Sequence, residues 1–230
     1  MNWLNLWEEI AKNQENLFQQ VGRTSRKGEM NETVLVKIAD YLQNQLSLQS
    51  QDRLLDVCCG NGMLTVLLSE KCAETTGVDF SNALIETAST HFANDKTHYL
   101  SGDALRLSEI LEGEKYDKIL LYFSFQYFDT FEKGKQVISE MSRLLKPQGV
   151  IWIGDVPDYD RYGNHYRTIR EKMRFHYAYF TGKNLIGKFW KQKEMAKIAD
   201  SLSLSLERIM QPEDLPYAHY RSDYCLRKKG

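Results

Sequence analysis

A turn of small residues between positions 56 and 62 has the composition of a loop that holds a nucleotide-like ligand. Asp56 lies in an apolar segment, and Gly60 and Gly62 follow it in the turn Cys-Cys-Gly-Asn-Gly. Because glycine lacks a Cβ, such a turn lets backbone N–H groups come close to a ligand. Asp56 could accept hydrogen bonds from a cationic group or from the loop amides. By itself the turn predicts only binding of something with a nucleotide-like part.

A second acidic residue, Asp79, ends the next apolar segment and is followed by Phe80. In an open parallel sheet, ligands bind beyond the carboxyl ends of the strands, where an acid on the neighbouring strand can hold the two hydroxyls of a ribose. Phe80 could stack on an adenine ring. The pair therefore favours a nucleoside-containing cofactor at this edge of the sheet.

Hydrophobic periodicity predicts the elements that must position these residues. From residue 53 onward, strand-like and helix-like segments alternate. The predicted strands are 53–58, 74–79, 97–100, 117–123 and 149–154, and the predicted helices are 62–71, 81–93, 107–112, 131–145 and 191–202. Ser81 is the expected N-cap of the second of these helices. Segments 204–210 and 219–228 are typical of a closing pair of strands. Near-continuous apolar strands between amphipathic helices indicate a parallel sheet covered on both faces.

Two helices are expected before this alternation. Residues 3–20 carry tryptophan, leucine and phenylalanine side chains at helical spacing, and a second helix is expected over about 31–47. The first could be a plain packing helix or a flap over a ligand pocket. The residues between the two helices form a polar loop that contains Arg23.

The bulk composition excludes several classes of protein. The chain has 230 residues with a net charge of −1, which fits one domain with elaborations and gives no overall nucleic-acid footprint. No apolar run approaches the roughly 18–20 residues that span a bilayer, and the N-terminus lacks the pattern of a secretory signal. The four cysteines form no C-x-x-C pair. We therefore expect a cytoplasmic protein with neither a disulfide framework nor a metal site.

Together, these motifs resemble those of the class I S-adenosylmethionine-dependent methyltransferases over roughly residues 50–155. The family's first motif, D/E-x-G-x-G-x-G, matches at Asp56, Gly60 and Gly62, but Cys58 stands where the first glycine is usual. The second motif, an acid that ends the second strand, falls on Asp79. The third falls on Gly102-Asp103-Ala104, the fourth strand ends near Tyr122, and the L-K-P-x-G turn matches residues 145–149.

The resemblance implies a Rossmann-like α/β fold in a single domain, with a mostly parallel seven-stranded sheet, an antiparallel last strand and helices on both faces. It divides the chain into an N-terminal helical cap (1–50), a cofactor-binding core (51–155), an α-helical lid rich in aromatic and basic residues (156–190), and a closing helix and strand pair (191–230). It also implies S-adenosyl-L-methionine as cofactor and S-adenosyl-L-homocysteine as product. The residues it assigns to the cofactor are Asp56, Cys58, Gly60, Gly62, Asp79, Phe80, Asp103, Ala104 and Tyr122. In similar proteins the segment before the core folds over the cofactor, where the Arg23 guanidinium could pair with the methionine carboxylate.

The stretch from Arg161 to Lys193 holds nine basic residues and one acid, Glu171. A solvated helical surface would account for this charge, and so would an acidic substrate such as a phosphate, a nucleotide-linked sugar or a carboxylate. A membrane surface or RNA is a further interpretation. Aromatic residues alternate with the basic ones and suit the roof of a pocket. The predicted substrate-binding residues are Tyr127, Tyr162, Tyr166 and Arg167.

Methyl transfer from a sulfonium mainly needs positioning and a dry site, because the methyl group is already activated. An alcohol acceptor usually needs a base, and an amine must be held neutral. The predicted catalytic residues are His165, Asp155 and His176. His165 ranks first because it follows the fifth strand closely and histidine suits proton transfer near neutral pH.

The sequence thus predicts methyl transfer to a small molecule, through an oxygen or nitrogen acceptor on an anionic or sugar-like substrate. A methyltransferase acting on RNA or protein is the alternative, and a non-catalytic cofactor-binding partner protein is a second one. A nicotinamide-binding loop would need a third glycine where Thr65 stands. No DNA partner and no membrane span are expected, and monomer and homodimer remain open.

Overall fold

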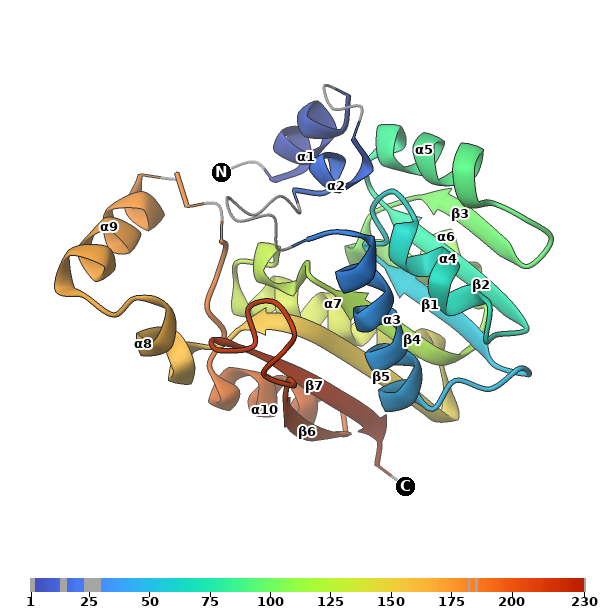
Figure 1. Cartoon of the computed structure of the whole chain (residues 1–230). Coiled ribbons are helices and arrows are strands. Elements are labelled where there is room, and N and C mark those ends of the chain that lie inside the picture. The colour runs from blue at the N-terminus through green and yellow to red at the C-terminus, as the bar shows by residue number, and fades with distance from the viewer. Residues whose placement is uncertain (1–2, 13–15, 23–29, 182, 185, 230) are drawn as a thin grey trace.

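The protein folds around one twisted sheet with helices on both sides (Figure 1). A computed structural model describes residues 3–12, 16–22, 30–181, 183–184 and 186–229. Seven strands form the sheet in the order β3-β2-β1-β4-β5-β7-β6. They are β1 (Arg53–Val57), β2 (Glu74–Asp79), β3 (Thr97–Ser101), β4 (Tyr116–Tyr122), β5 (Leu145–Pro157), β6 (Leu204–Met210) and β7 (Arg221–Lys228).

Strands β1 to β5 pair in parallel, and β7 runs antiparallel to both of its neighbours, β5 and β6. From β1 the chain first proceeds outward to β2 and β3, and then crosses to β4 on the other side of β1. This reversal opens a crevice at the carboxyl ends of β1 and β4, where ligands bind in folds of this kind. The predicted Rossmann-like sheet with an antiparallel last strand is confirmed.

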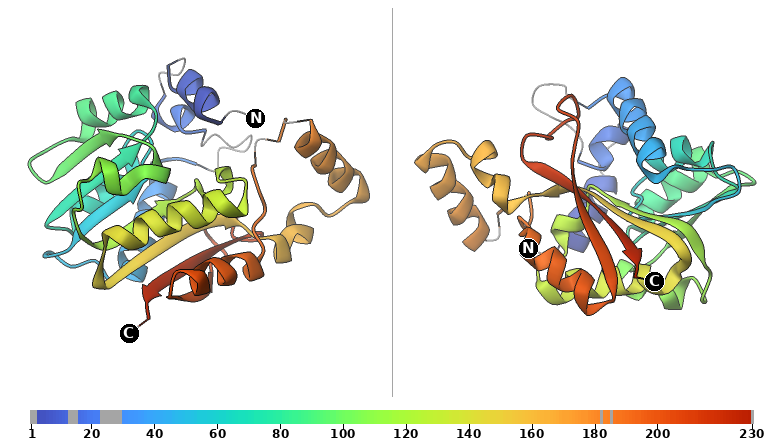
Figure 2. Two further views of the ribbon diagram at one scale, coloured as in Figure 1. Left: turned by 180° about the vertical axis from the view of Figure 1, so that it is seen from behind. Right: turned by 90° about the horizontal axis from the view of Figure 1, so that it is seen from below.

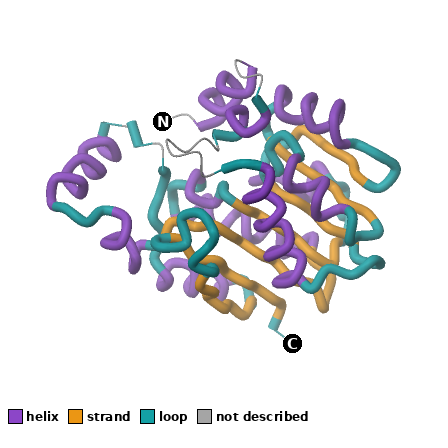
Figure 3. The backbone as a smooth tube through the Cα atoms, in the orientation of Figure 1, coloured by secondary structure: helices purple, strands orange, loops and turns teal. Residues whose placement is uncertain are grey.

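The helices form a layer on each face of the sheet (Figure 3). One apolar core joins the sheet to α6 (Leu107–Ile110), α7 (Phe131–Leu144) and α10 (Gln192–Ser201). A second core joins the opposite face to α3 (Glu32–Leu46) and α4 (Met63–Ser69), while α5 (Asn82–Phe92) packs beside them on β2 and β3. The fully buried side chains alternate along β4 and β5 between the two cores, as the two-residue period of a strand requires.

Most predicted bounds agree with the structure to within two residues, and two predicted elements differ by more. Strand β5 extends beyond 149–154 at both ends, because β4 pairs with Leu145 and β7 pairs with Val156 and Pro157. The expected helix over 3–20 consists of two helices, α1 (Trp3–Lys12) and α2 (Leu17–Gln20). The second begins anew because the Asn16 side chain accepts hydrogen bonds from the N–H groups of Phe18 and Gln19.

Helices α1 and α2, which we call the cap, are held against the core by polar contacts. Glu8 on α1 accepts a short hydrogen bond from the hydroxyl of Ser81, the N-cap residue of α5. From the glycine loop, Asn61 Nδ2 donates to the backbone oxygen of Leu17 at 2.8 Å and to Gln20 Oε1 at 3.0 Å. The cap is therefore tied to both the first and the second strand ends.

Residues 158–190, which we call the lid, leave the sheet at the end of β5 and return beside it. Their two ends are joined, because Tyr159 N–H donates to Trp190 O at 2.9 Å and Trp190 N–H donates to Pro157 O at 2.9 Å. Between these ends lie the turn Tyr159–Arg161 and helices α8 (Tyr162–His165) and α9 (Ile169–Phe180). Figure 2 shows α9 projecting away from the sheet. Among the described residues, no helix is both long and apolar enough to cross a bilayer.

Candidate active site

A cavity of about 510 Å³ opens at the carboxyl ends of β1, β2 and β4. Its volume lies within the range of small-molecule sites, and its walls are mostly apolar with a few polar groups, as such sites usually are. It gathers most of the predicted cofactor residues and one predicted substrate residue. These are Cys58, Gly60, Asp79, Phe80, Asp103, Ala104 and Tyr127.

The glycine loop follows a left-handed path that leaves room for a ligand. Cys58, Gly60 and Gly62 have φ angles of +59°, +60° and +80°, a region that L side chains rarely adopt. A Cβ at Gly60 would lie 2.9 Å from the Val21 side chain, and a Cβ at Gly62 would lie 2.8 Å from the Tyr99 hydroxyl. The conformation at Cys58 shows why related loops use glycine there.

Asp56 and Gly62 do not line the cavity, but they fix the backbone of the glycine loop. The buried carboxylate of Asp56 accepts a hydrogen bond from the Thr65 hydroxyl at 2.6 Å, which ties the end of β1 to the first turn of α4. Gly62 precedes α4 and supplies the turn into it. Both predicted residues therefore shape the loop, and their direct contact with a cofactor stays a prediction.

Asp79 is the central polar group of the cavity. Its Oδ2 accepts from the Gly60 N–H at 2.9 Å and its Oδ1 accepts from the Ser81 N–H at 3.0 Å. Burial raises the pKa of Asp79 to about 6, and the backbone hydrogen bonds partly oppose this rise. The group is therefore mainly a carboxylate at neutral pH. A carboxylate has about four acceptor positions, and the backbone of Phe80 also donates to Asp79, so the group retains acceptor capacity for a ligand hydroxyl.

The third strand end provides a flat, mostly apolar wall. Asp103 Oδ1 accepts from the Leu105 N–H at 2.9 Å and caps the short turn Ala104–Arg106. Its side chain is exposed at the rim, while Ala104 is buried. Phe80, which follows the end of β2, lines the same cavity. An aromatic base would fit between these apolar groups and leave its polar edge near Asp103.

The cap contributes Trp7, which the sequence suggested only as part of a possible flap. Trp7 and Tyr127 both line the cavity, and their rings meet edge to face with centroids 5.5 Å apart. The Trp7 Nε1–H is buried and has no hydrogen-bond partner within the described residues. A buried N–H of this kind usually finds a partner. A ligand oxygen in the cavity would supply one.

Several other lining residues carry little or no signal in a single sequence. Val21 of the cap, Lys133 of α7, and Phe123, Ser124 and Phe128 after β4 reach the wall through the packing of separate elements. The strand end at residue 122 was the only available signal for the group after β4. Nothing in the sequence pattern singled out Val21 or Lys133.

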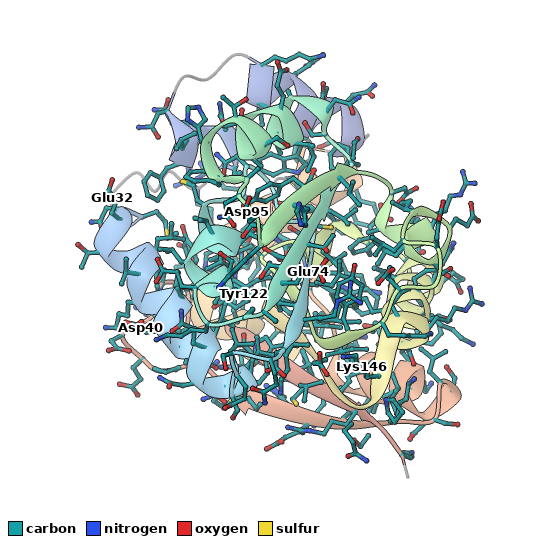
Figure 4. All side chains as sticks on the ribbon, turned by 90° about the vertical axis from the view of Figure 1, so that its right-hand side faces the viewer. Glu32, Asp40, Glu74, Asp95, Tyr122 and Lys146 are labelled. Carbon is teal, nitrogen blue, oxygen red and sulfur yellow. The ribbon has the colours of Figure 1, made fainter. Side chains whose placement is uncertain are left out.

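Tyr122 and Asp155 also lie away from the cavity. Tyr122 is buried on the α3 face of the sheet, where its hydroxyl accepts from Gln211 Nε2 at 3.2 Å (Figure 4). Tyr122 does not line the cavity, whereas Phe123, whose ring meets that of Tyr122 edge to face with centroids 4.3 Å apart, does. A contact of Tyr122 with the cofactor stays a prediction.

Asp155 lies in a buried ion pair. Its φ is +57°, and its carboxylate accepts from Arg221 Nη1 at 2.5 Å. The Asp155 N–H donates to Asp223 Oδ1 at 2.8 Å, and burial raises the pKa of Asp223 to about 7. A carboxylate held by a guanidinium is a weak base. The structure thus places Asp155 at the root of the lid rather than on the cavity wall.

The remaining predicted residues belong to the lid and do not line the cavity. His165 is half-buried against the Tyr220 ring, with centroids 4.2 Å apart. Burial, and then the charges of His219 and Arg221, lower its pKa, so the neutral imidazole is favoured. Tyr162 and Tyr166 pack into the lid's aromatic cluster, whereas His176 and Arg167 are exposed. Their functional roles stay predictions, and Arg23 lies outside the described residues.

Comparison with known proteins agrees with this arrangement. Residues 54–149 match the family model of a methyltransferase domain. A malonyl-[acyl-carrier protein] O-methyltransferase of Acetivibrio thermocellus is 28% identical over 194 residues, which cover 80% of this chain and 65% of that protein. The chain thus spans less than two thirds of that relative's length.

Solved structures extend the similarity to the whole fold. An S-adenosylmethionine-dependent methyltransferase from Clostridium acetobutylicum aligns with a TM-score of 0.68 at 16% identity, covering 93% of this chain and 98% of that one. The N-methyltransferase NodS from Bradyrhizobium japonicum, in complex with S-adenosyl-L-homocysteine, aligns with a TM-score of 0.67 at 15% identity over the full length of both chains.

The sheet order, the site at its switch point and the matched domain together define a Rossmann-like methyltransferase fold. Residues 54–149 are thus similar to a methyltransferase domain, and the chain shares its fold with S-adenosylmethionine-dependent methyltransferases.

Proposed function

We propose that this protein transfers a methyl group from S-adenosylmethionine to an oxygen or nitrogen atom of a small anionic molecule. The observation that carries the cofactor part is Asp79, a buried carboxylate that faces the cavity while it accepts the N–H of Gly60. The glycine loop and this acid are the two features by which parallel sheets hold a ribose.

The residues of the cavity fit the parts of the cofactor. Asp79 would accept hydrogen bonds from the ribose hydroxyls, and Phe80, Ala104 and Asp103 would enclose the adenine. The unpartnered Nε1–H of Trp7 would donate to an oxygen of the methionine portion. When bound, the cofactor supplies an activated methyl group. The apolar side chains of Trp7, Tyr127 and Phe128 would exclude water and hold the acceptor in line with it.

Two features favour a small anionic acceptor. Lys133 reaches the cavity wall from the first turn of α7, where its Nζ also pairs with Asp129 Oδ1 at 2.9 Å, and the lid that follows β5 is strongly basic. The malonyl-[acyl-carrier protein] relative acts on an acyl-carrier substrate by its name, and NodS is an N-methyltransferase. The cavity volume of about 510 Å³ accommodates a cofactor and a small molecule rather than a folded polymer.

We further propose that His165 accepts the proton of the acceptor. Its lowered pKa keeps the imidazole neutral and ready to take a proton at neutral pH. Because His165 lies outside the cavity, this role requires the lid to approach the bound acceptor. Full turnover by both His165→Ala and His176→Ala would exclude a histidine base.

Calorimetric titration with S-adenosylmethionine and S-adenosylhomocysteine tests the cofactor assignment. Asp79→Asn should weaken binding of both by about tenfold or more, because one carboxylate oxygen is replaced by a donor. Asp95→Asn, an exposed loop position, is the matched control and should leave binding unchanged. Equal affinities of the two variants would overturn the assignment.

A methyl-tritium assay then separates the acceptor classes. The enzyme is incubated with labelled cofactor and with metabolite, RNA and protein fractions in turn. Label in small molecules supports the proposal, whereas label only in RNA or protein would assign a polymeric acceptor. Cofactor binding with no label in any fraction would favour a non-catalytic partner protein.

A further inference from the structure

Helix α9 carries a row of large apolar side chains that face solvent. Ile169, Met173, Tyr177 and Phe180 are 78%, 68%, 68% and 87% exposed. Their spacing of three or four residues places them on one side of the helix. We call these four residues the α9 stripe. Exposed apolar residues are ordinary when scattered, but a contiguous row of them marks an interaction surface.

Basic residues border the α9 stripe. A shallow hollow on the helix surface is lined by three stripe residues together with Arg170 and Arg174, and Lys172 lies on the helix's other flank by its periodicity. The one acidic residue of the helix, Glu171, accepts from the Thr168 N–H at 2.8 Å in a capping box. This acid therefore belongs to the helix start, and the apolar row is bordered by positive charge.

The opposite side of α9 fixes this orientation. Phe175 packs against Tyr162, Tyr166 and Phe189, with ring centroids 4.9 to 5.4 Å apart. The capping box at Thr168 holds the helix start independently. The lid is thus a small aromatic cluster that presents the α9 stripe outward from the projecting helix (Figure 2).

We propose that the α9 stripe seats the protein on an anionic lipid surface. A helix with an apolar face between cationic flanks lies in the plane of a bilayer interface, with its apolar side chains among the acyl chains and its arginines at the lipid phosphates. Each basic residue near an anionic surface adds attraction. The net charge of the whole chain is −1, so the basic lid is the face that such a surface attracts.

The shape of the lid favours a lipid surface over a protein partner. The stripe lies on a convex, projecting helix (Figure 1), whereas protein interfaces bury their central residues in matched pockets. One short helix also gives weak, reversible membrane binding. The lid leaves the sheet at the end of β5, on the same edge as the cavity. Seating α9 on a bilayer would therefore bring the active-site edge close to the lipid surface.

Vesicle co-sedimentation of the full chain tests this inference. The probes are vesicles of pure phosphatidylcholine and vesicles of equal parts phosphatidylcholine and phosphatidylglycerol. The protein should sediment with the anionic vesicles and not with the neutral ones, and the bound fraction should fall as salt is added. Absence of binding to the anionic vesicles, or equal binding to both kinds, overturns the proposal.

Two pairs of variants locate the binding surface. Met173→Ser/Phe180→Ser should lower the partition to anionic vesicles by about tenfold or more. Its control, Val36→Ser/Met210→Ser, removes apolar groups elsewhere that are 46% and 51% exposed and should bind as the wild type does. Arg170→Glu/Arg174→Glu should lower binding by a similar factor, while Lys193→Glu/Lys197→Glu on α10 should lower it much less. All variants should keep their circular dichroism and their affinity for S-adenosylmethionine.

Other occupants of the stripe would give different results. A second copy would appear as a concentration-dependent dimer that Phe180→Ser dissolves. An acidic protein partner would appear as binding to soluble polyglutamate without binding to anionic vesicles. Either result would overturn the lipid proposal, and neither depends on the methyl acceptor or on cofactor binding.

Discussion

The cap and the lid are both short helical additions to the same core, and both are rich in aromatic residues, but they face in opposite directions. In the cap, Trp7 turns into the cavity and meets Tyr127. In the lid, Phe180 and Ile169 turn to solvent, while Phe175 packs into the lid's own aromatic cluster. The cap has polar contacts with the core from both of its helices, while the lid is joined to the core at its ends and through α8, which contacts His219 and Tyr220.

This difference shows that an amphipathic sequence pattern indicates the apolar face of a helix. It does not indicate which part of the molecule, if any, packs against that face. The apolar face of the cap packs at the cavity wall, because Ser81 and Asn61 hold the cap there. Helix α9 is held by its own aromatic cluster and leaves its apolar row uncovered. Four predictions test or sharpen this comparison.

The largest expected effect is at the root of the lid. Arg221→Met leaves the Asp155 carboxylate buried without its cation, which should cost about 3–5 kcal/mol of unfolding free energy. Urea unfolding followed by circular dichroism measures the loss. The double variant Arg221→Met/Asp155→Asn should recover part of it, because the buried charge is gone. A loss within about 0.5 kcal/mol of wild type would mean that the pair is not the anchor of the lid.

The next effect compares one aromatic residue from each addition. Trp7→Ala should weaken S-adenosylmethionine binding by about tenfold, or ~1.4 kcal/mol, because it removes a cavity wall. Phe180→Ala, which removes an exposed ring, should leave both cofactor affinity and stability nearly unchanged. Calorimetry of the two variants side by side decides the point. Equal effects would show that the cap and the lid are not distinguished in the way their packing indicates.

A smaller effect is expected where the cap meets α5. Ser81→Ala removes the N-cap hydrogen bond to the Leu84 N–H and the contact with Glu8, and should cost about 1 kcal/mol of stability. Thr130→Ala, at the N-cap of α7, removes a comparable cap without touching the N-terminal helices. Only the Ser81 variant should also lose cofactor affinity.

The smallest effect is a pH dependence of cap docking. The hydrogen bond from Ser81 lowers the pKa of Glu8 below its ordinary value of 4.5. The ionised group therefore adds stability that is fully present above pH 4.5 and is lost as the pH falls through the lowered folded-state value. The stability difference between wild type and Glu8→Gln should shrink as the solution is acidified. If the stability difference between the two proteins stayed constant on acidification, the ionised Glu8 side chain would not contribute to the docking of the cap.

The sequence predicted the core well because its signals are local. The apolar runs of β1 and β4 and the N-cap at Ser81 fall within the elements observed. Gly60 and Asp79 could be recognised from the sequence because a glycine turn followed by an acid at the next strand end is typical of a ligand-binding loop. The glycine loop, Asp79 and Asp103 accordingly meet at one cavity.

The rest depended on contacts between distant segments. Trp7 reaches the cavity only because Glu8 bonds Ser81, far away along the chain. Asp155 has the sequence position of a catalytic base at a strand end, but in the structure its carboxylate pairs with Arg221 of β7. Phe123 follows the end of β4 with a φ of +69° and packs its ring against that of Tyr122, a local backbone turn that no residue pattern announced.

The hydrogen bond between Tyr159 and Trp190, which joins the two ends of the lid, should also allow another segment to take the place of the lid. Because the chain leaves and re-enters the core at one point, the length of the intervening segment hardly affects the closure entropy, and doubling it costs only about 0.6 kcal/mol. Insertions, deletions or whole-segment exchange between these two residues should therefore leave the sheet intact. Related chains can therefore differ in the lid, and with it in the methyl acceptor and in surface attachment, while they keep the same cofactor site.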